Sequence, residues 1–395
     1  MTTKLIGYIL IICAAIMLVI VLLMSNIIQT RPQLFSAKSL LSSVWQDYKN
    51  QYVEAASGRV INKQQSNVTT SEGISYTMLR AVWSDDKVAF DQTLSWAQKN
   101  LQRPDSLFSW EYGTKTNGTQ GILTDQGGQN SATDGDVNIA LALIFASKRW
   151  SDPTYMSTAT PILNSIWSKE VVTVAGVPYV SADDIERLSK TRVVINPSYF
   201  EPYAYRIFAS MDKTHNWMAL VDSSYALLEI STKSSLDQTS SGNLPPDWIT
   251  LNRLTGDIVP NEGTLTTNFS YDALRVPWNI ALDYEWFKDP RAKSYLDNLK
   301  ILSAYWNTDK KLYSVYKHDG TTSSFTETPA MYAGSIGYFM WSDPKVGAEI
   351  YKDKLSSLFN PDINSWKQPL SYYDDNWVWF GIALYSHHLP NLSEN

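Results

Sequence analysis

Apolar side chains recur every three to four residues along most of the chain, with polar positions between them. This spacing places them on one face of a helix, and it predicts about twelve α-helices. The predicted helices are Ala37–Val53, Ser71–Val82, Val88–Leu101, Asp134–Arg149, Tyr155–Trp167, Pro197–Ser210, Asn216–Leu228, Ser270–Phe287, Ala292–Tyr305, Pro329–Trp341, Val346–Leu358 and Tyr373–His387. The loops between them are rich in glycine, serine, asparagine and proline, and short strands such as Val171–Val180 are expected there. Helices without a linker predict a ring of helix pairs around one core, with an all-α solenoid as the alternative.

The first 30 residues follow a different pattern. Leu5 to Met24 form a run of 20 residues without a charged side chain. At 1.5 Å per residue, a helix of that length spans about 30 Å, the thickness of a bilayer core. No small-residue cleavage pair of the kind that ends a signal peptide follows the run. We therefore expect residues 1–30 to form a single-pass membrane anchor, with a cleaved signal segment as the alternative, and residues 31–395 to form one domain.

Composition excludes several classes of function. The formal net charge is −6, from 33 lysines and arginines against 39 aspartates and glutamates, which argues against a nucleic-acid partner. The lone cysteine, Cys13, excludes an internal disulfide, and the four histidines lack the spacing of zinc ligands, so no metal site is expected. Tryptophan and tyrosine, at 15 and 23 residues, exceed the needs of a core and predict a surface that stacks on something flat.

Three acidic sites are candidates for chemistry, and each has a structural alternative. Thr69 and Glu72 match a capping box, in which Glu72 bonds back to the start of its own helix. Asp134 and Asp136 flank Gly135 at the head of an apolar helix, where acids stabilise the helix dipole.

One cap needs only one acid, however, and glycine is costly inside a helix, so a close approach of two helices at Gly135 is the competing interpretation. Asp272 and Arg275 are three residues apart, which favours a local ion pair, although Asp272 is also expected in the first turn of a long helix.

All three acids lie at the N-terminal ends of predicted helices. In a ring of helix pairs the inner helices run parallel, so their N-termini open on one side. We therefore expect Glu72, Asp134 and Asp272 to meet in one cleft. The aromatic residues expected near that cleft are Trp110, Tyr112, Tyr199, Tyr205, Trp217, Trp248 and Tyr271. Aromatic planes stack on sugar rings and carboxyl groups cleave the bond between them, so this combination favours a polysaccharide cleft.

The sequence around these acids resembles that of the family 8 glycoside hydrolases. The segment from Ala132 to Trp150 is similar to the signature of that family, position by position. Ser71-Glu72-Gly73 with Tyr76 resembles its acid motif, and Tyr271-Asp272-Ala273-x-Arg275 resembles its base motif. Weaker similarities are Gly58–Ile61, Asn196–Tyr199, Pro246–Trp248 and Tyr372–Trp377. The resemblance extends over roughly residues 37 to 388, and it implies an (α/α)6 barrel.

The resemblance also implies a mechanism and a substrate class. Glu72 would be the proton donor, Asp272 the general base of an inverting reaction, and Asp134 an acid that binds the sugar at the cleavage point, while Arg275 holds a neighbouring acid ionised. We expect an endo-acting hydrolase of β-1,4-glucan, with chitosan or xylan as alternative substrates and a non-catalytic polysaccharide-binding barrel as the rival. No cofactor is required, and a monomer is expected. The anchor would hold the catalytic domain outside the cell, or the domain would be secreted if the leader is cleaved.

The position of the donor creates a conflict. A helix N-terminus lowers the pKa of a carboxylic acid, yet a proton donor must stay protonated near neutral pH. A nearby like charge and partial burial both raise the pKa. We therefore expect Asp134 to lie close to Glu72.

Overall fold

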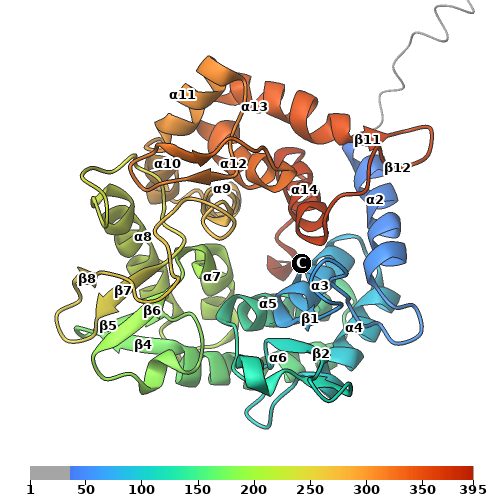
Figure 1. Ribbon diagram of the computed structural model, residues 1–395. Coiled ribbons are helices and arrows are strands. Elements are labelled where there is room, and N and C mark those ends of the chain that lie inside the picture. Colours follow the sequence, from blue (N-terminus) through green and yellow to red (C-terminus); the bar gives the residue numbers. More distant parts are fainter. Residues whose placement is uncertain (1–35, 395) are drawn as a thin grey trace, which may run out of the picture.

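The computed structural model describes residues 36–394 (Figure 1). The anchor predicted for residues 1–30 lies outside the described residues and stays a prediction. Within residues 36–394, no helix combines the length and the apolar character needed to cross a bilayer.

The described residues form a double ring of helices, which confirms the predicted (α/α)6 barrel (Figure 1). The inner ring consists of α3 (Ser71–Trp83), α5 (Thr133–Arg149), α7 (Pro202–Met211), α9 (Arg275–Phe287), α12 (Pro329–Ser342) and α14 (Tyr372–Tyr385). The outer helices are α2 (Ala37–Tyr52), α4 (Lys87–Asn100), α6 (Pro153–Ser165), α8 (Trp217–Lys233), α10 (Pro290–Leu296) and α13 (Pro344–Ile350), with α11 (Lys300–Asp309) as an addition.

Burial differs between the two rings as their sequences require. In α5 every side chain from Thr133 to Ala146 is buried, because an inner helix is covered on all sides. In α2 the buried residues, among them Leu41, Val44 and Tyr48, recur at helical spacing and leave the opposite face to solvent. The inner helices are therefore the rigid elements on which a site can be built.

Small antiparallel sheets occupy the loops, so the described chain is not purely α-helical. They are β1 (Thr69–Thr70) with β2 (Glu111–Thr114) and β3 (Gln120–Ile122), β4 (Val171–Val174) with β5 (Val177–Val180), β6 (Arg192–Ile195) with β7 (Ile249–Asn252) and β8 (Ile258–Val259), β9 (Val315–Tyr316) with β10 (Thr322–Ser324), and β11 (Phe359–Asn360) with β12 (Ser365–Trp366). The hairpin β4–β5 confirms the strands expected in this loop. In the register of β6 and β7, Ile195 lies opposite Ile249, which brings Asn196 and Trp248 to the same end of the sheet.

Two predicted helices are interrupted. The segment predicted over 197–210 is a 3₁₀ turn at Pro197–Tyr199 followed by α7, because Pro202 fits only the first helical position and disfavours helical backbone at Glu201. The segment predicted over 292–305 is divided into α10 and α11. Between them Asn298 and Leu299 donate to carbonyls three residues back, which tightens and ends α10.

The close approach of α3 and α5 depends on Gly135. A Cβ on this residue would lie 2.5 Å from Ser71 Oγ and 3.0 Å from the backbone carbon of Ser71. A side chain here would push the two helices apart. This confirms the interpretation of Gly135 as a close-approach site, and it sets Glu72 and Asp134 beside each other.

Candidate active site

Three acids, two from inner helices and one from the turn before α9, meet at one arginine. The Nη1 group of Arg275 donates to Glu72 Oε2 at 3.0 Å and to Asp134 Oδ2 at 2.9 Å. Its Nη2 group donates to Asp272 Oδ1 at 2.5 Å. Arg275 is only 4% exposed, so these interactions are little screened by water. The predicted convergence of the three acids is therefore present, and Arg275 is its centre.

Glu72 is not part of a capping box. Thr70 is the N-cap of α3 and accepts a hydrogen bond from Gly73 N at 3.1 Å. Thr69 instead donates its hydroxyl to Val60 O and accepts from Arg59 Nε. The side chain of Glu72 is 27% exposed and extends toward Arg275 rather than back along its own helix. The capping-box interpretation is wrong, and the Glu72 carboxyl is left available for chemistry.

The surroundings of Glu72 suit a proton donor. Burial raises the pKa of Glu72 to about 7; the Arg275 guanidinium opposes this rise, and the charges of Asp134 and Asp272 add to it. Asp134 is thus the nearby like charge that the conflict at the helix N-terminus required. At neutral pH the Glu72 carboxyl retains a proton in a substantial share of molecules.

Asp134 and Asp136 have separate roles. Asp134 faces the cluster, its Oδ1 accepting from Gly135 N at 2.9 Å while its other oxygen binds Arg275. Burial raises the pKa of Asp134, and Arg275 counteracts this. Asp136 points away and accepts from Phe108 N at 2.9 Å. Residues two apart on a helix project in nearly opposite directions, so only Asp134 reaches the Arg275 cluster.

Asp272 lies in a turn before α9, not in the first turn of that helix as predicted. Its Oδ1 accepts from Asn196 Nδ2 at 3.0 Å as well as from Arg275, and its Oδ2 accepts from Trp248 Nε1 at 3.0 Å. The predicted local ion pair with Arg275 is present, but it is one of several hydrogen bonds that hold the Asp272 carboxyl group. The side chain remains 30% exposed. Asp272 is therefore held from several sides and still open to water.

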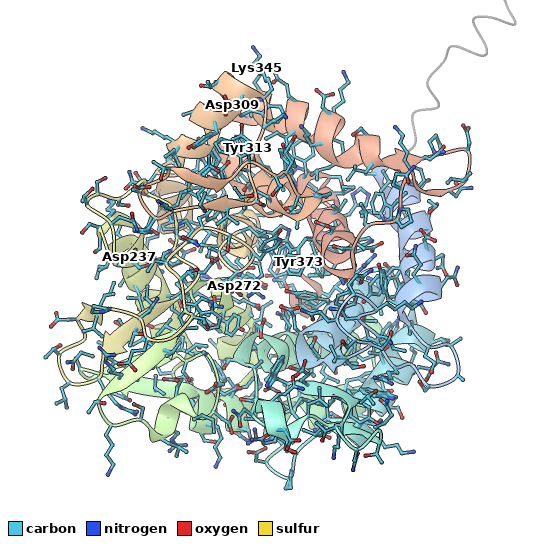
Figure 2. All side chains as sticks on the ribbon, in the orientation of Figure 1. Asp237, Asp272, Asp309, Tyr313, Lys345 and Tyr373 are labelled. Atoms are coloured by element: carbon cyan, nitrogen blue, oxygen red, sulfur yellow. The ribbon has the colours of Figure 1, made fainter. Side chains whose placement is uncertain are left out.

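A cleft of about 360 Å³ opens beside Glu72. Its lining includes Thr70, Glu72, Tyr271, Tyr373 and Asp374. Figure 2 shows Asp272 and Tyr373 near the middle of the ring, whereas Asp237 lies at its edge. A larger cavity, of about 600 Å³, lies against α8 and the β7–β8 hairpin, but its lining is mainly aliphatic and includes none of the three acids.

Comparison with known proteins gives this site a family. Residues 18–362 match the model of the glycosyl hydrolases family 8. The chain belongs to this family. It is 32% identical over 270 residues to Endoglucanase 2 of Ruminiclostridium josui, an alignment that covers 66% of this chain and 54% of that protein. It is 30% identical over 356 residues to the endoglucanase of Cellulomonas uda, covering 87% of this chain and 90% of the relative.

The family 8 fold is also found among solved structures. The endo-1,4-D-glucanase of Vibrio fischeri ES114 superimposes with a TM-score of 0.73 and 25% sequence identity, covering 87% of this chain and 94% of that one. The chain spans about half the length of the first relative named above. The resemblance identified from the sequence motifs is confirmed.

One of the predicted aromatic residues, Tyr271, lines the cleft, and two others, Trp110 and Tyr199, lie next to residues of the acid cluster. Trp110 is half-buried and accepts, through its backbone oxygen, from Ser71 N at 3.0 Å. The ring of Tyr199 lies 5.2 Å from the Arg275 guanidinium. Tyr271 is 47% exposed and packs edge-on against Tyr373 at 6.0 Å.

Two predicted sugar-binding residues, Tyr205 and Trp217, do not reach the cleft. Both side chains are fully buried. The Tyr205 hydroxyl donates to Tyr199 O at 2.8 Å, and the Trp217 ring packs against Phe208 at 5.0 Å in the contact of α7 and α8. The prediction that they bind substrate is wrong, because these aromatics fill the core between the two helices.

Sequence reasoning missed Glu201, which lies behind Asp134. Its Oε1 accepts from Asn138 Nδ2 at 2.7 Å, and both residues line a small cavity with Asp134 and Arg275. Burial raises the pKa of Glu201 to about 8, Asn138 opposes this, and the Asp134 charge adds to it. The signal in the sequence was Pro202. It begins α7 and disfavours helical backbone at the residue before it, which leaves Glu201 just outside the helix.

Asp136 and Glu170 form a buried pair of acids that should make the stability of the fold depend on pH. Glu170, at the end of the π-helical turn Ile166–Glu170, lies beside Asp136, and burial raises the pKa of Glu170 to about 8. The group is protonated in the folded chain over a range where it is ionised when unfolded. Its stabilising contribution is therefore complete below about pH 4.5 and is lost as the pH rises through 8.

We expect the difference in melting temperature, Glu170→Gln minus parent, to be a few °C larger at pH 8.5 than at pH 5. The neutral amide cannot ionise, so it does not share the alkaline loss of stability. The exposed substitution Glu262→Gln is the control and should show no such trend in thermal melts at the two pH values. An equal difference for Glu170→Gln at both pH values would contradict the prediction.

Proposed function

We propose that this chain is an inverting, endo-acting glycoside hydrolase that cleaves β-1,4-linked glucan. The observation that carries the proposal is the arrangement of Glu72, Asp134 and Asp272 around Arg275, in which burial raises the pKa of Glu72 and the Asp272 side chain stays partly exposed to solvent. A barrel that only binds polysaccharide would need aromatic surfaces but not this set of acids.

The proposed reaction is a direct displacement at the anomeric carbon. Glu72 gives its proton to the glycosidic oxygen as the bond from that oxygen to the anomeric carbon breaks. Asp272 removes a proton from a water molecule whose oxygen forms the new bond from the opposite face. Asp134 binds the sugar at the cleavage point and places negative charge beside the positively charged transition state.

One arginine holds the proposed donor and base near each other. Glu72 and Asp272 bind different nitrogens of one planar guanidinium, so their bonded oxygens lie within roughly 8 Å of each other. An inverting pair requires a separation of about 6.5–9.5 Å to leave room for the attacking water. The shared arginine thus keeps donor and base within the reach of one glycosidic bond.

The relatives support glucan as the substrate. The similar proteins are named endoglucanases, and the superimposed structure is an endo-1,4-D-glucanase. The exposed ring of Tyr271, which lines the cleft, provides a plane on which a glucose unit can stack.

Proton NMR of the first products tests substrate and stereochemistry together. The purified chain is incubated with β-1,4-glucan, mixed-linkage glucan, xylan and chitosan, and the new anomeric proton is followed. We expect the α-anomer to appear first from β-1,4-glucan, with a rapid loss of viscosity that indicates internal cleavage. A β-anomer appearing first would refute inversion. No new reducing ends from any polymer would leave only the binding function.

A further inference from the structure

Asp247 holds the turn that carries Asp272. This turn, residues 270–274, precedes α9, which has no side-chain cap of its own. Asp247 Oδ1 accepts from Ser270 N at 3.1 Å and from Ala273 N at 2.8 Å, and Oδ2 accepts from the Ser270 hydroxyl. A side chain 23 to 26 residues earlier in the chain thus caps the turn from outside, as an N-cap residue does from within.

The segment around Asp247 is itself fixed. Asp247 N donates to Asn268 O at 2.6 Å, and Trp248 N donates to Thr266 O at 3.1 Å. On the far side, Phe269 and Tyr316 exchange two backbone hydrogen bonds, at 2.9 and 3.0 Å. The turn therefore begins from a backbone position that is restrained on both sides.

Asp247 and Trp248 hold different parts of Asp272: the backbone around it and its carboxyl group. Asp247 binds the backbone on either side of Asp272, and the indole of the next residue, Trp248, donates to the Asp272 carboxylate at 3.0 Å. Asp247 is 3% exposed and is not among the residues that line the cleft, so it does not reach a substrate. Burial raises the pKa of Asp247 to about 7, with the Asp272 charge adding to the rise.

From these contacts we infer that Asp247 is a positioning residue for the reaction, which sets the place of the Asp272 carboxylate without touching the sugar. The inference rests on the proposed function, in which Asp272 is the general base. A general base must lie within hydrogen-bond reach of the water it activates, and a displacement of about 1 Å can cost 10²-fold in rate.

Two substitutions separate hydrogen bonding from charge. Asp247→Ala is expected to lower kcat on β-1,4-glucan on the order of 10- to 100-fold, and to change KM by less than about threefold because the sugar contacts remain. Asp247→Asn is expected to restore most of kcat, since its amide oxygen still accepts from both backbone groups. A loss in Asp247→Asn as large as that in Asp247→Ala would overturn the inference.

A remote aspartate provides the matched control. Asp343 accepts from the Ser303 hydroxyl at 2.9 Å and caps the outer helix α13, far along the chain from the three acids. Asp343→Ala removes a similar set of hydrogen bonds and should leave kcat near that of the parent. Equal falls in kcat for the two alanine variants would mean that Asp247 stabilises the fold generally, and the inference would fail.

A double-mutant cycle tests whether Asp247 acts through Asp272. With azide as the nucleophile, Asp247→Ala added to Asp272→Ala should cause less than about a twofold further loss, because the group that it positions is gone. Losses that multiply would refute the inference while leaving the proposed function intact. Full activity of Asp272→Ala alone would refute the proposed function itself, and the positioning role with it.

Discussion

Glu72→Gln is expected to lower kcat on β-1,4-glucan by about 10³-fold, with little change in the affinity for the polymer. The amide fills the same space beside Arg275 but cannot give a proton to the departing oxygen. Reducing-end assays give kcat, and binding to the uncleaved polymer gives the affinity. The defect should largely disappear on an aryl β-cellobioside with a strongly acidic phenol, because such a leaving group departs without a proton.

The pH profile provides an independent readout of the same residue. In the parent, a donor with a pKa of about 7 must be protonated, so kcat/KM should fall as the pH rises through 7. The residual activity of Glu72→Gln on the aryl substrate should lack this alkaline limb. Glu54→Gln, an exposed substitution away from the cleft, is the control for the change of charge. Equal losses on the polymer and on the aryl substrate would rule out Glu72 as the donor.

The positions of the helices along the chain were predictable, because a helix shows in the local spacing of apolar residues. An amphipathic helix such as α2 shows its buried face in the sequence, and the apolar run of α5 shows that this helix is covered on all sides. The breaks were less visible. Proline at position 202 and the turn between α10 and α11 interrupt segments that remain apolar at helical spacing across the break.

The acids of the site and the pairing of Asp272 with Arg275 were predictable, but the hydrogen bonds to Asp272 from Asn196 and Trp248 were not. Glu72 and Asp134 stand out because each begins a helix, and Asp272 because it closely precedes one, and a ring of helices brings such ends together. The donors to Asp272 come from 76 and 24 residues earlier, at Asn196 and Trp248, and the pairing of β6 with β7 brings them to the site. No local pattern encodes that pairing.

The role of an aromatic residue is even harder to infer from sequence. Tyr199 and Tyr205 are six residues apart, yet one lies over Arg275 and the other is fully buried beneath it. Both are compatible with a core or with a sugar platform, since either use requires a flat apolar surface. The path of the chain at Glu201–Pro202 separates the two rings, so that only Tyr199 lies against Arg275.

Asp272→Ala is expected to lower kcat by roughly 10³- to 10⁴-fold, and sodium azide should restore part of the lost activity. The base is needed only to take a proton from water, and azide is an anion that carries no proton to remove. Loss of the carboxylate also leaves space and removes a negative charge beside Arg275, so a small anion can enter. Product analysis by NMR and mass spectrometry measures the rescue.

The configuration of the azide product tests from which face the anomeric carbon is attacked. Azide entering from the side of Asp272 forms the new bond from nitrogen to the anomeric carbon while the glycosidic bond breaks and Glu72 protonates the departing sugar. A β-linked substrate must then yield an α-glycosyl azide. Azide should not rescue Glu72→Gln on the polymer, since that variant lacks the donor rather than the base. A β-glycosyl azide from Asp272→Ala would indicate two displacements in place of one, and Asp272 could not then be the base of an inverting hydrolase.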